Sequence, residues 1–286
     1  MAKETTMIER FKNLDRRIIF TLVAIAVIIP LLRPIGLKTD VTKEVKDVYD
    51  RIEKLQAGER VLLSFEYDPA SKPEIHPMAI AITHHLLNKG VKIAVVALWP
   101  MGSEMADQVF ELMKADSRFG HKFEDDGTTW VNLGYKAGGP TVIKLAGSKF
   151  QEAFPGSKSG VPFADIKILR GVKSISDFKM ILSFSAGDPG LKQWVQIANA
   201  QYGVDVAGGV TAVSAPEFYP YYNSNQMFGI LGGLKAAAEY EALIGVPGKA
   251  TSGMDAQSVV HLVIIGFILF ANAVYFIERK QMKGVE

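Results

Sequence analysis

Four polar segments, each placed directly after an apolar run, hold the side chains that could do chemistry. They are residues 66–69, 99–103, 185–190 and 214–222, and all are enriched in glycine, proline, aromatic or acidic residues. If the apolar runs are parallel strands, these segments lie at one sheet edge, the carboxyl edge, where ligands bind in open α/β folds. The candidate catalytic groups are Asp68, Ser185, Asp188, Ser214 and Glu217, and the candidate ligand-binding residues are Tyr67, Trp99, Gly102, Ser103, Gly187 and Gly190.

Carboxylate and hydroxyl groups offer two kinds of chemistry. Asp68 and Glu217 would suit acid–base catalysis or a hard metal ion, because paired carboxylates perform both tasks. The simpler interpretation, which we favour, is a turn aspartate before Pro69 and a solvated loop glutamate. Ser185 and Ser214 end strands as a nucleophile would, but neither lies in a GxSxG motif and neither has an assignable partner base. A serine hydrolase is therefore disfavoured.

Anion binding is the next chemistry that the spacing allows. Residues 101–104 and 187–190 stand where backbone N–H groups at a helix start could hold an anion. We favour a structural role, in which Asp188 caps the helix, Pro189 takes its first position and the glycines allow a tight turn. No GxGxxG follows the first strand, and the Gly-Lys pair near the carboxyl terminus precedes Ala250 where a P-loop needs serine or threonine.

The sequence contains no motif for metal binding or for thiol chemistry. His84 and His85 are adjacent and point to different helix faces, so with His76 they are interpreted as satisfied or surface histidines. There is no HExxH motif and no cysteine, which excludes disulfides, thiolate metal sites and cysteine nucleophiles. We predict no metal and no cofactor, and an enzymatic role is left open but disfavoured.

An alternation of apolar runs and amphipathic stretches must position these residues. The nearly continuous apolar runs indicate strands that are covered on both faces. The sequence predicts a Rossmann-like or flavodoxin-like, doubly wound, mainly parallel sheet of about five strands. The predicted strands are 61–66, 92–98, 130–133, 180–185 and 207–213, and the predicted helices are 77–88, 103–115, 141–154, 191–202 and 225–243.

Two apolar runs flank this region and predict transmembrane helices over residues 18–37 and 258–277. The first contains Arg33, which must reach the interface, and no small-x-small cleavage site follows it. The second is free of Asp, Glu, Lys and Arg. Basic residues precede the first run and follow the second, which predicts a two-pass protein of the cell membrane with cytoplasmic termini and an extracytoplasmic domain.

The remaining segments complete the predicted organisation. Residues 1–17 and 278–286 are cytoplasmic ends, 59–244 is the α/β domain, and 245–257 is a polar linker. Residues 38–58 hold a stalk helix with an a/d stripe from Val41 to Leu55, which would pack either on the domain or on another subunit. The formal net charge of +2 is too small to indicate a nucleic-acid partner.

Aromatic and small residues near the end of the domain point toward assembly. The candidate interface comprises Phe218, Tyr219, Tyr221, Tyr222, Phe228, Gly229, Gly232 and Gly233. Dense aromatics suit a protein interface, and a small-residue face permits close approach, although packing inside the fold would explain both. We therefore expect a binding or structural subunit of a membrane assembly, in contact with lipid and with its own copies or other subunits. The alternative is a tethered hydrolase-like enzyme or small-ligand sensor acting at the carboxyl edge.

Overall fold

The computed structural model describes residues 15–37, 40–115 and 127–283. The chain divides into two compact units, which we call the helical unit and the α/β domain. The helical unit comprises Met1–Lys38 with Thr251–Glu286, and the α/β domain comprises Thr39–Ala250. The chain passes between them twice, so both ends of the α/β domain continue into the helical unit.

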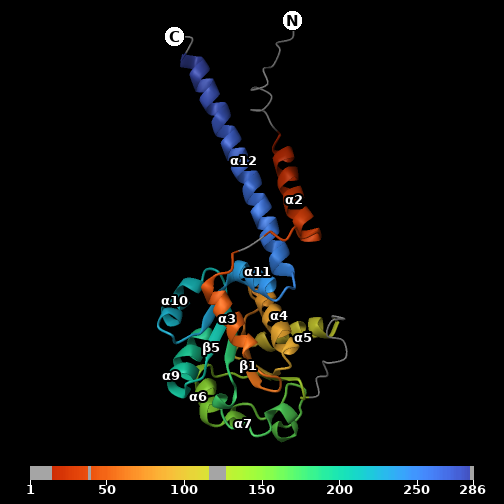
Figure 1. Ribbon diagram of the computed structural model, residues 1–286, viewed down its shortest axis with the longest axis vertical. Coiled ribbons are helices and arrows are strands. Elements are labelled where there is room, and N and C mark those ends of the chain that lie inside the picture. The colour runs from red at the N-terminus through yellow and green to blue at the C-terminus, as the bar shows by residue number, and fades with distance from the viewer. Residues whose placement is uncertain (1–14, 38–39, 116–126, 284–286) are drawn as a thin grey trace. The chain divides into compact units, whose positions relative to one another are not determined.

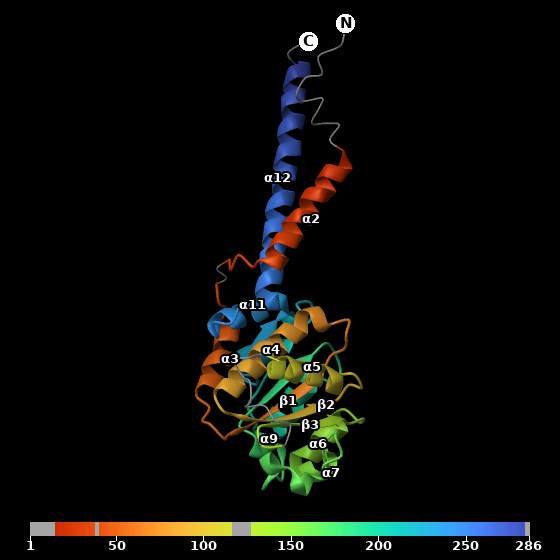
Figure 2. The ribbon, with the colours of Figure 1, turned by 90° about the vertical axis from the view of Figure 1, so that its right-hand side faces the viewer.

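The α/β domain is built on a six-stranded, all-parallel sheet (Figures 1 and 2). The strand order is β3-β2-β1-β4-β5-β6. This confirms the predicted Rossmann-like or flavodoxin-like α/β class and adds one strand. The strands are β1 (Arg60–Glu66), β2 (Lys92–Ala97), β3 (Trp130–Tyr135), β4 (Ile181–Ser185), β5 (Val206–Val210) and β6 (Gly229–Gly232).

Helices cover both faces of the sheet, which explains why its strands are apolar on both sides. One face, which we call the upper layer, carries α3 (Lys43–Glu53), α4 (Lys72–Asn88), α5 (Gly102–Ala115) and α11 (Gly233–Leu243) (Figure 2). The opposite face carries α6 (Pro140–Ser148), α7 (Phe150–Ala153), α8 (Leu191–Trp194), α9 (Ala200–Tyr202) and α10 (Ala215–Asn223), with a π-helical turn at Val195–Asn199 and three 3₁₀ turns at Phe163–Asp165, Lys167–Leu169 and Ile175–Asp177.

Two predicted elements in the region 214–243 were wrong. The predicted loop 214–222 is helix α10, and the predicted helix 225–243 contains strand β6 before α11 begins. A four-residue apolar run bounded by glycines does not reveal its period, so helix and strand cannot be separated from the pattern alone. At the junction Gly233 has a φ of +68°. A Cβ there would lie 2.6 Å from the Ala212 side chain, so the turn requires glycine.

The predicted stalk helix is part of the α/β domain. Helix α3 packs on β6 and α11, and Val45, Val48 and Ile52 on its inner face are buried. The a/d stripe is therefore used inside the fold, which decides between the two partners that the sequence left open. The predicted polar linker 245–257 is also corrected, because helix α12 (Lys249–Lys283) already begins at Lys249.

The helical unit contains α2 (Arg16–Leu32) and most of α12. Helix α2 ends at Leu32, five residues before the predicted end of the first span, because Arg33 is extended and Pro34 lacks an amide hydrogen. After α2, the backbone N–H groups of Ile35, Gly36 and Leu37 all donate to the buried carboxylate of Asp255, at 2.7, 2.8 and 3.0 Å. This nest of donors joins the chain after α2 to α12.

Candidate functional site

The strand order reverses between β1 and β4, so the ends of these two strands form the switch point where open α/β sheets bind ligands. Glu66 at the end of β1 is the register partner of Ser185 at the end of β4. The predicted segments 66–69 and 185–190 therefore meet at this edge, and 99–103 follows the neighbouring strand β2. The structure thus brings most of the predicted site residues to one edge, where their individual contacts decide what they can do.

Asp68 and Tyr67 are engaged in the turn that leads into α4. Asp68 is half-buried, and its Oδ1 accepts from the N–H groups of Ala70 and Ser71, both at 3.1 Å. Those are the donors that an anion at the start of α4 would use. Tyr67 is fully buried, and its hydroxyl lies 2.7 Å from His76 Nδ1. Burial lowers the pKa of His76 to about 4, so the neutral ring accepts a hydrogen bond from Tyr67.

The loop after β4 is closed by Trp99. The indole Nε1 donates to Pro189 O at 2.8 Å, and a Cβ on Gly187 would lie 3.4 Å from the indole ring. Ser185 Oγ donates to Gly187 O at 2.9 Å, and Gly190 N donates to Gln193 Oε1 at 2.7 Å. The hydroxyl and the two glycines therefore shape the turn. Asp188, which precedes Pro189 through a cis peptide bond, is exposed to solvent. The predicted cap is wrong, because Gly190 is the N-cap of α8 and Leu191, rather than Pro189, is its first residue.

The start of α5 lies directly against β1. A Cβ on Gly102 would come within 1.9 Å of Phe65 O, so only glycine fits this approach. Ser103 is buried, and its Oγ is 3.4 Å from Asn132 Oδ1. These predicted ligand residues therefore fix a helix on the sheet, and no space for a ligand remains between Gly102 and β1.

Ser214 and Glu217 lie at the start of α10, beyond β5. Ser214 Oγ is 3.0 Å from Thr211 Oγ1, and Glu217 Oε1 forms an ion pair with Lys192 Nζ at 2.7 Å. Strand β4 separates their strand from β1, so the structure does not join Glu217 to Asp68 as a carboxylate pair. Among the described residues no cluster of three or more His, Asp or Glu side chains could hold a metal.

Glu66 is the residue at this edge that the sequence interpretation missed. Its carboxyl group is fully buried, accepts from Ser183 Oγ at 2.8 Å, and also bonds Ser64 Oγ. Trp194 Nε1 donates to Ser64 Oγ at 2.9 Å and closes the cluster. Burial raises the pKa of Glu66 to about 7, against the opposing effect of these hydrogen bonds. The spacing of Ser64 and Glu66 was the available signal, because residues two apart on a strand share a face.

The predicted interface residues divide into buried and accessible groups. Phe218 belongs to the core, and a Cβ on Gly229 would lie 2.4 Å from the Val48 side chain of α3. Gly232 and Gly233 likewise approach Ala215 and Ala212, so the small residues serve internal packing. Tyr219 is 41% exposed, and Tyr221, Tyr222 and Phe228 are half-buried.

Two of these aromatic residues line a groove between α3 and the segment after α10. The groove has a volume of about 580 Å³, and it is lined by Lys43, Asp47, Asp50, Arg51, Lys54, Tyr222, Asn223, Asn225, Met227 and Phe228. Asp47 accepts from Lys43 Nζ at 2.6 Å and from the Tyr222 hydroxyl at 2.5 Å, and Arg51 lies over the Phe228 ring. The groove is thus a polar, half-open surface feature whose main charges are already paired.

At the carboxyl edge, the side chains of Glu66, Asp68, Trp99 and Ser185 have intramolecular hydrogen-bond partners, whereas Asp188 is exposed. Comparison with known proteins adds no external assignment, because no protein-family model matches the chain and no curated protein is significantly similar to it.

Proposed function

We propose that this chain is a two-pass membrane protein whose extracytoplasmic α/β domain is a binding or structural subunit of a membrane assembly. The observation that carries the proposal is the filled switch point. Where an α/β enzyme keeps a crevice, this chain places the Trp99 ring over Gly187 and the Asp68 carboxylate on the donors before α4. A site that is already satisfied by its own side chains favours a structural use of the fold.

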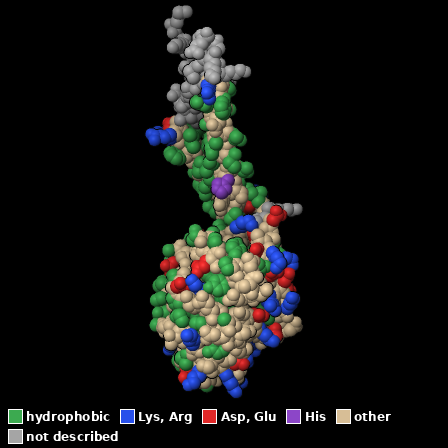
Figure 3. Space-filling model, turned by 90° about the vertical axis from the view of Figure 1, so that its left-hand side faces the viewer, with side chains coloured by type: hydrophobic (Ala, Val, Ile, Leu, Met, Phe, Trp, Pro, Cys, Tyr) green, Lys and Arg blue, Asp and Glu red, His purple; other side chains and the backbone are tan. Residues whose placement is uncertain are grey.

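The membrane part of the proposal is supported by α12. Its segment Lys249–Ile277 is 29 residues long and contains an 18-residue window that has a mean hydropathy of 2.3 and no buried residues. Exposed side chains such as Leu262, Ile268 and Leu269 would each gain about 1.5–3 kcal/mol on transfer from water to an apolar phase. Figure 3 shows hydrophobic side chains along the helices, whereas acidic and basic side chains gather on the α/β domain. A bilayer is the apolar phase that a helix of this length fits.

The proposed first span is α2 with the residues that follow it. Seventeen helical residues reach about 25 Å, which is short of a hydrocarbon core of about 30 Å. From Ile18 to Leu32 its exposed side chains are nonetheless apolar except for Thr21, and they include Phe20. The nest around Asp255 supports a pairing of α2 with α12, because three backbone donors near the end of α2 are satisfied by α12. Tilt or local bilayer thinning accommodates a short span at modest cost.

The two ends of the α/β domain support a hairpin arrangement of the spans. Thr42, before α3, donates through N and Oγ1 to Glu239 Oε2 on α11, at 2.9 and 2.7 Å. Glu241, also on α11, accepts from Gly248 N at 2.8 Å and Ala250 N at 3.0 Å at the start of α12. Helix α11 therefore holds both points where the chain leaves the domain. Two neighbouring exits suit two neighbouring spans, with the basic flanks at the cytoplasmic ends.

The mass of the particle extracted from its native membrane in mild detergent tests the assembly role. A homo-oligomer or a larger particle of fixed stoichiometry is the expected result. The matched variants are Tyr219→Ala, on the exposed face of α10, and Met101→Ala, at an exposed apolar position on the loop before α5. The first should weaken the particle more than the second. A monodisperse monomer without a partner would contradict the proposal.

A second candidate, a tethered enzyme or small-ligand sensor, is favoured by one observation. Glu66 is a buried carboxyl group with a pKa raised to about 7 at the switch point, which is how general acids are tuned. In that case Asp68→Ala and Asp188→Ala, made separately, should abolish activity or ligand response while leaving the melting temperature nearly unchanged. Variants that unfold or behave like the parent chain would assign these aspartates to the turn.

A further inference from the structure

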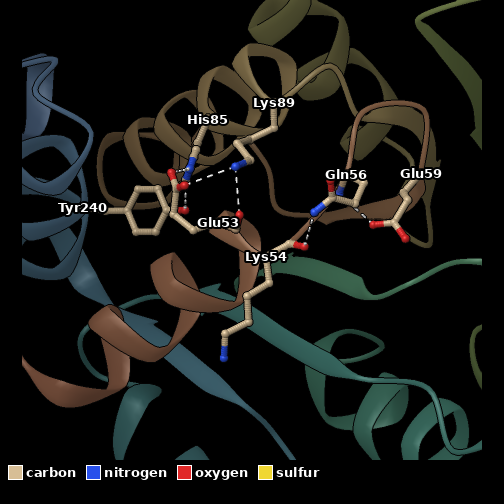
Figure 4. A network of polar contacts seen from close by, with 7 residues as sticks. All are labelled: Glu53, Lys54, Gln56, Glu59, His85, Lys89 and Tyr240. Atoms are coloured by element: carbon tan, nitrogen blue, oxygen red, sulfur yellow. Dashed lines mark hydrogen bonds and ion pairs between the residues drawn. The ribbon is translucent and has the colours of Figure 1, made fainter.

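A chain of hydrogen bonds joins three helices of the upper layer through His85 (Figure 4). His85, on α4, is buried, and its Nε2 lies 2.7 Å from Glu53 Oε1 on α3. Its Nδ1 lies 2.8 Å from the hydroxyl of Tyr240 on α11. Lys89 Nζ, one turn along α4, donates to the Glu53 carbonyl at 2.8 Å and to Oε2 at 3.1 Å. One imidazole therefore bridges the two helices that adjoin the membrane connections.

The hydrogen bonds assign one tautomer to the imidazole. Hydrogen bonds from His85 and Lys89 lower the pKa of Glu53, which is therefore ionised and can only accept. Nε2 must then carry the hydrogen that is donated to Glu53, and Nδ1 must accept from Tyr240. Tyr240 is fully buried, so its hydroxyl hydrogen depends on that acceptor. Protonation of Nδ1 would turn the acceptor into a donor and leave the Tyr240 hydrogen without its partner.

The groups that face His85 decide the sign of a pH effect. Tyr49 of α3 stacks on the ring with centroids 4.9 Å apart, and Tyr240 of α11 packs at 5.9 Å. Glu53 is the acidic group that would stabilise an imidazolium, and Lys89 on the same helix opposes it. Burial, the largest effect, lowers the pKa of His85, while Glu53 opposes that shift. The folded arrangement therefore favours the neutral ring.

We propose that Glu53, His85 and Tyr240 form a pH-sensitive clamp. Near neutral pH it holds α3 and α11, which adjoin the two membrane connections, on α4, and on acidification it loosens them. The sign follows from linkage: a base whose pKa is lowered by folding stabilises the folded form above its ordinary pKa of about 6.5 and less below it. The clamp lies wholly within the α/β domain, so its test is independent of the assembly role.

Hydrogen exchange of the full chain in mild detergent tests the clamp. Protection factors of α3 and α11 amides, corrected for intrinsic exchange, are compared at about pH 7.5 and about pH 5.5. An undocked imidazole of ordinary pKa gains protons over this range, so we expect protection to fall by up to about tenfold. His85→Gln keeps a donor and an acceptor but takes up no proton. The protection factors of its α3 and α11 amides should therefore change by less than about twofold between the two pH values.

Matched variants keep the proposal falsifiable. His84→Gln alters the neighbouring histidine, which contacts Asn88 instead, and should keep the parent response. His76 titrates at about pH 4, below the measured range. Glu66, with a pKa of about 7, titrates within the range with the opposite sign, but it is present in the parent and in every variant, so each variant is compared with the parent. Should His85→Gln fail to fold, Tyr240→Phe removes the hydroxyl that protonation would strand and should reduce the response by about half or more. Variants of His85 and Tyr240 that both respond like the parent would overturn the clamp.

Discussion

At the residue scale, three acidic side chains satisfy backbone N–H groups at or before the starts of helices. Asp68 satisfies backbone donors before α4, Glu239 satisfies those before α3, and Glu241 satisfies those at the start of α12. Acidic side chains at helix starts are favourable because they meet unpaired N–H groups and the positive end of the helix dipole. Glu66 is different, because it is fully buried and its described side-chain partners are the hydroxyls of Ser64 and Ser183 and the Trp194 indole.

Glu66 makes the stability of the domain depend on pH. Its pKa rises from 4.5 to about 7 on folding, so its stabilising contribution is complete below pH 4.5 and is lost as the pH rises through 7. Glu66→Gln should therefore stabilise the chain by roughly 2–3 kcal/mol at about pH 8 relative to the parent, and by much less at about pH 5. Chemical denaturation at both pH values measures this, and a variant that is equally stabilised at both would contradict the assignment.

At the element scale, the two helices next to the connections with the helical unit are held by close packing and by buried acceptors. Helix α3 rests on strand β6 at Gly229 and is joined to α11 through Glu239. Neither contact is visible in a local pattern, because the partners are far apart in the chain. Both contacts predict that a substitution on one element will change the position or the stability of the other.

Gly229→Ala should push α3 away from β6. The added Cβ would lie 2.4 Å from Val48 Cγ2 and 2.7 Å from Glu44 O, so strand or helix must shift. We expect a loss of about 1–3 kcal/mol in the free energy of unfolding. Gly187→Ala is the matched control, because its Cβ would meet only the Trp99 ring at 3.4 Å. Thermal melts of both variants distinguish them, and equal melting temperatures would place the strain elsewhere.

Glu239→Ala should loosen the start of α3. It removes the acceptor of both Thr42 donors from a position that is 1% exposed, so we expect a loss of about 1–3 kcal/mol. Glu217→Ala removes a carboxylate of the same type from an exposed ion pair with Lys192 and should have little effect. Denaturant titration of the two variants provides the comparison, and a Glu217 variant that is the more destabilised would refute this ranking.

At the scale of the whole molecule, the two proposed spans and the domain between them predict a topology. Arg16 and Arg17 precede the first proposed span, and Arg279 and Lys280 follow the second. Basic flanks stay on the cytoplasmic side, which places the α/β domain outside.

Protease added to intact cells or spheroplasts should therefore cleave the α/β domain without lysis. A cytoplasmic marker protein must remain uncut in the same sample, which shows that the membrane is sealed. Cleavage that requires lysis would reverse the orientation and place the domain in the cytoplasm, while leaving the fold and the spans unaffected.

The sequence by itself determined the second apolar helix and the α/β class. Residues 258–277 lack charge, and residues 61–66, 92–98 and 180–185 are apolar runs between amphipathic stretches, so chain-local chemistry was sufficient. The carboxyl-edge segments were also predictable, because they follow from the ends of the parallel strands. The predicted start at Ser103 was accurate to one residue, whereas α4 begins at Lys72, five residues before its predicted start.

Only the tertiary structure decided which groups at that edge are free. Trp99 and Pro189 are far apart in sequence, as are Glu66 and Ser183 or His85 and Tyr240, and no periodicity predicts such pairs. Gly229–Gly232 forms a strand because it pairs in parallel with β5, and the backbone hydrogen bonds of this pairing outweigh the weak strand propensity of its glycines. Burial and hydrogen-bond partners are properties of the packed chain, and they decide which of the predicted site residues are already engaged within the fold.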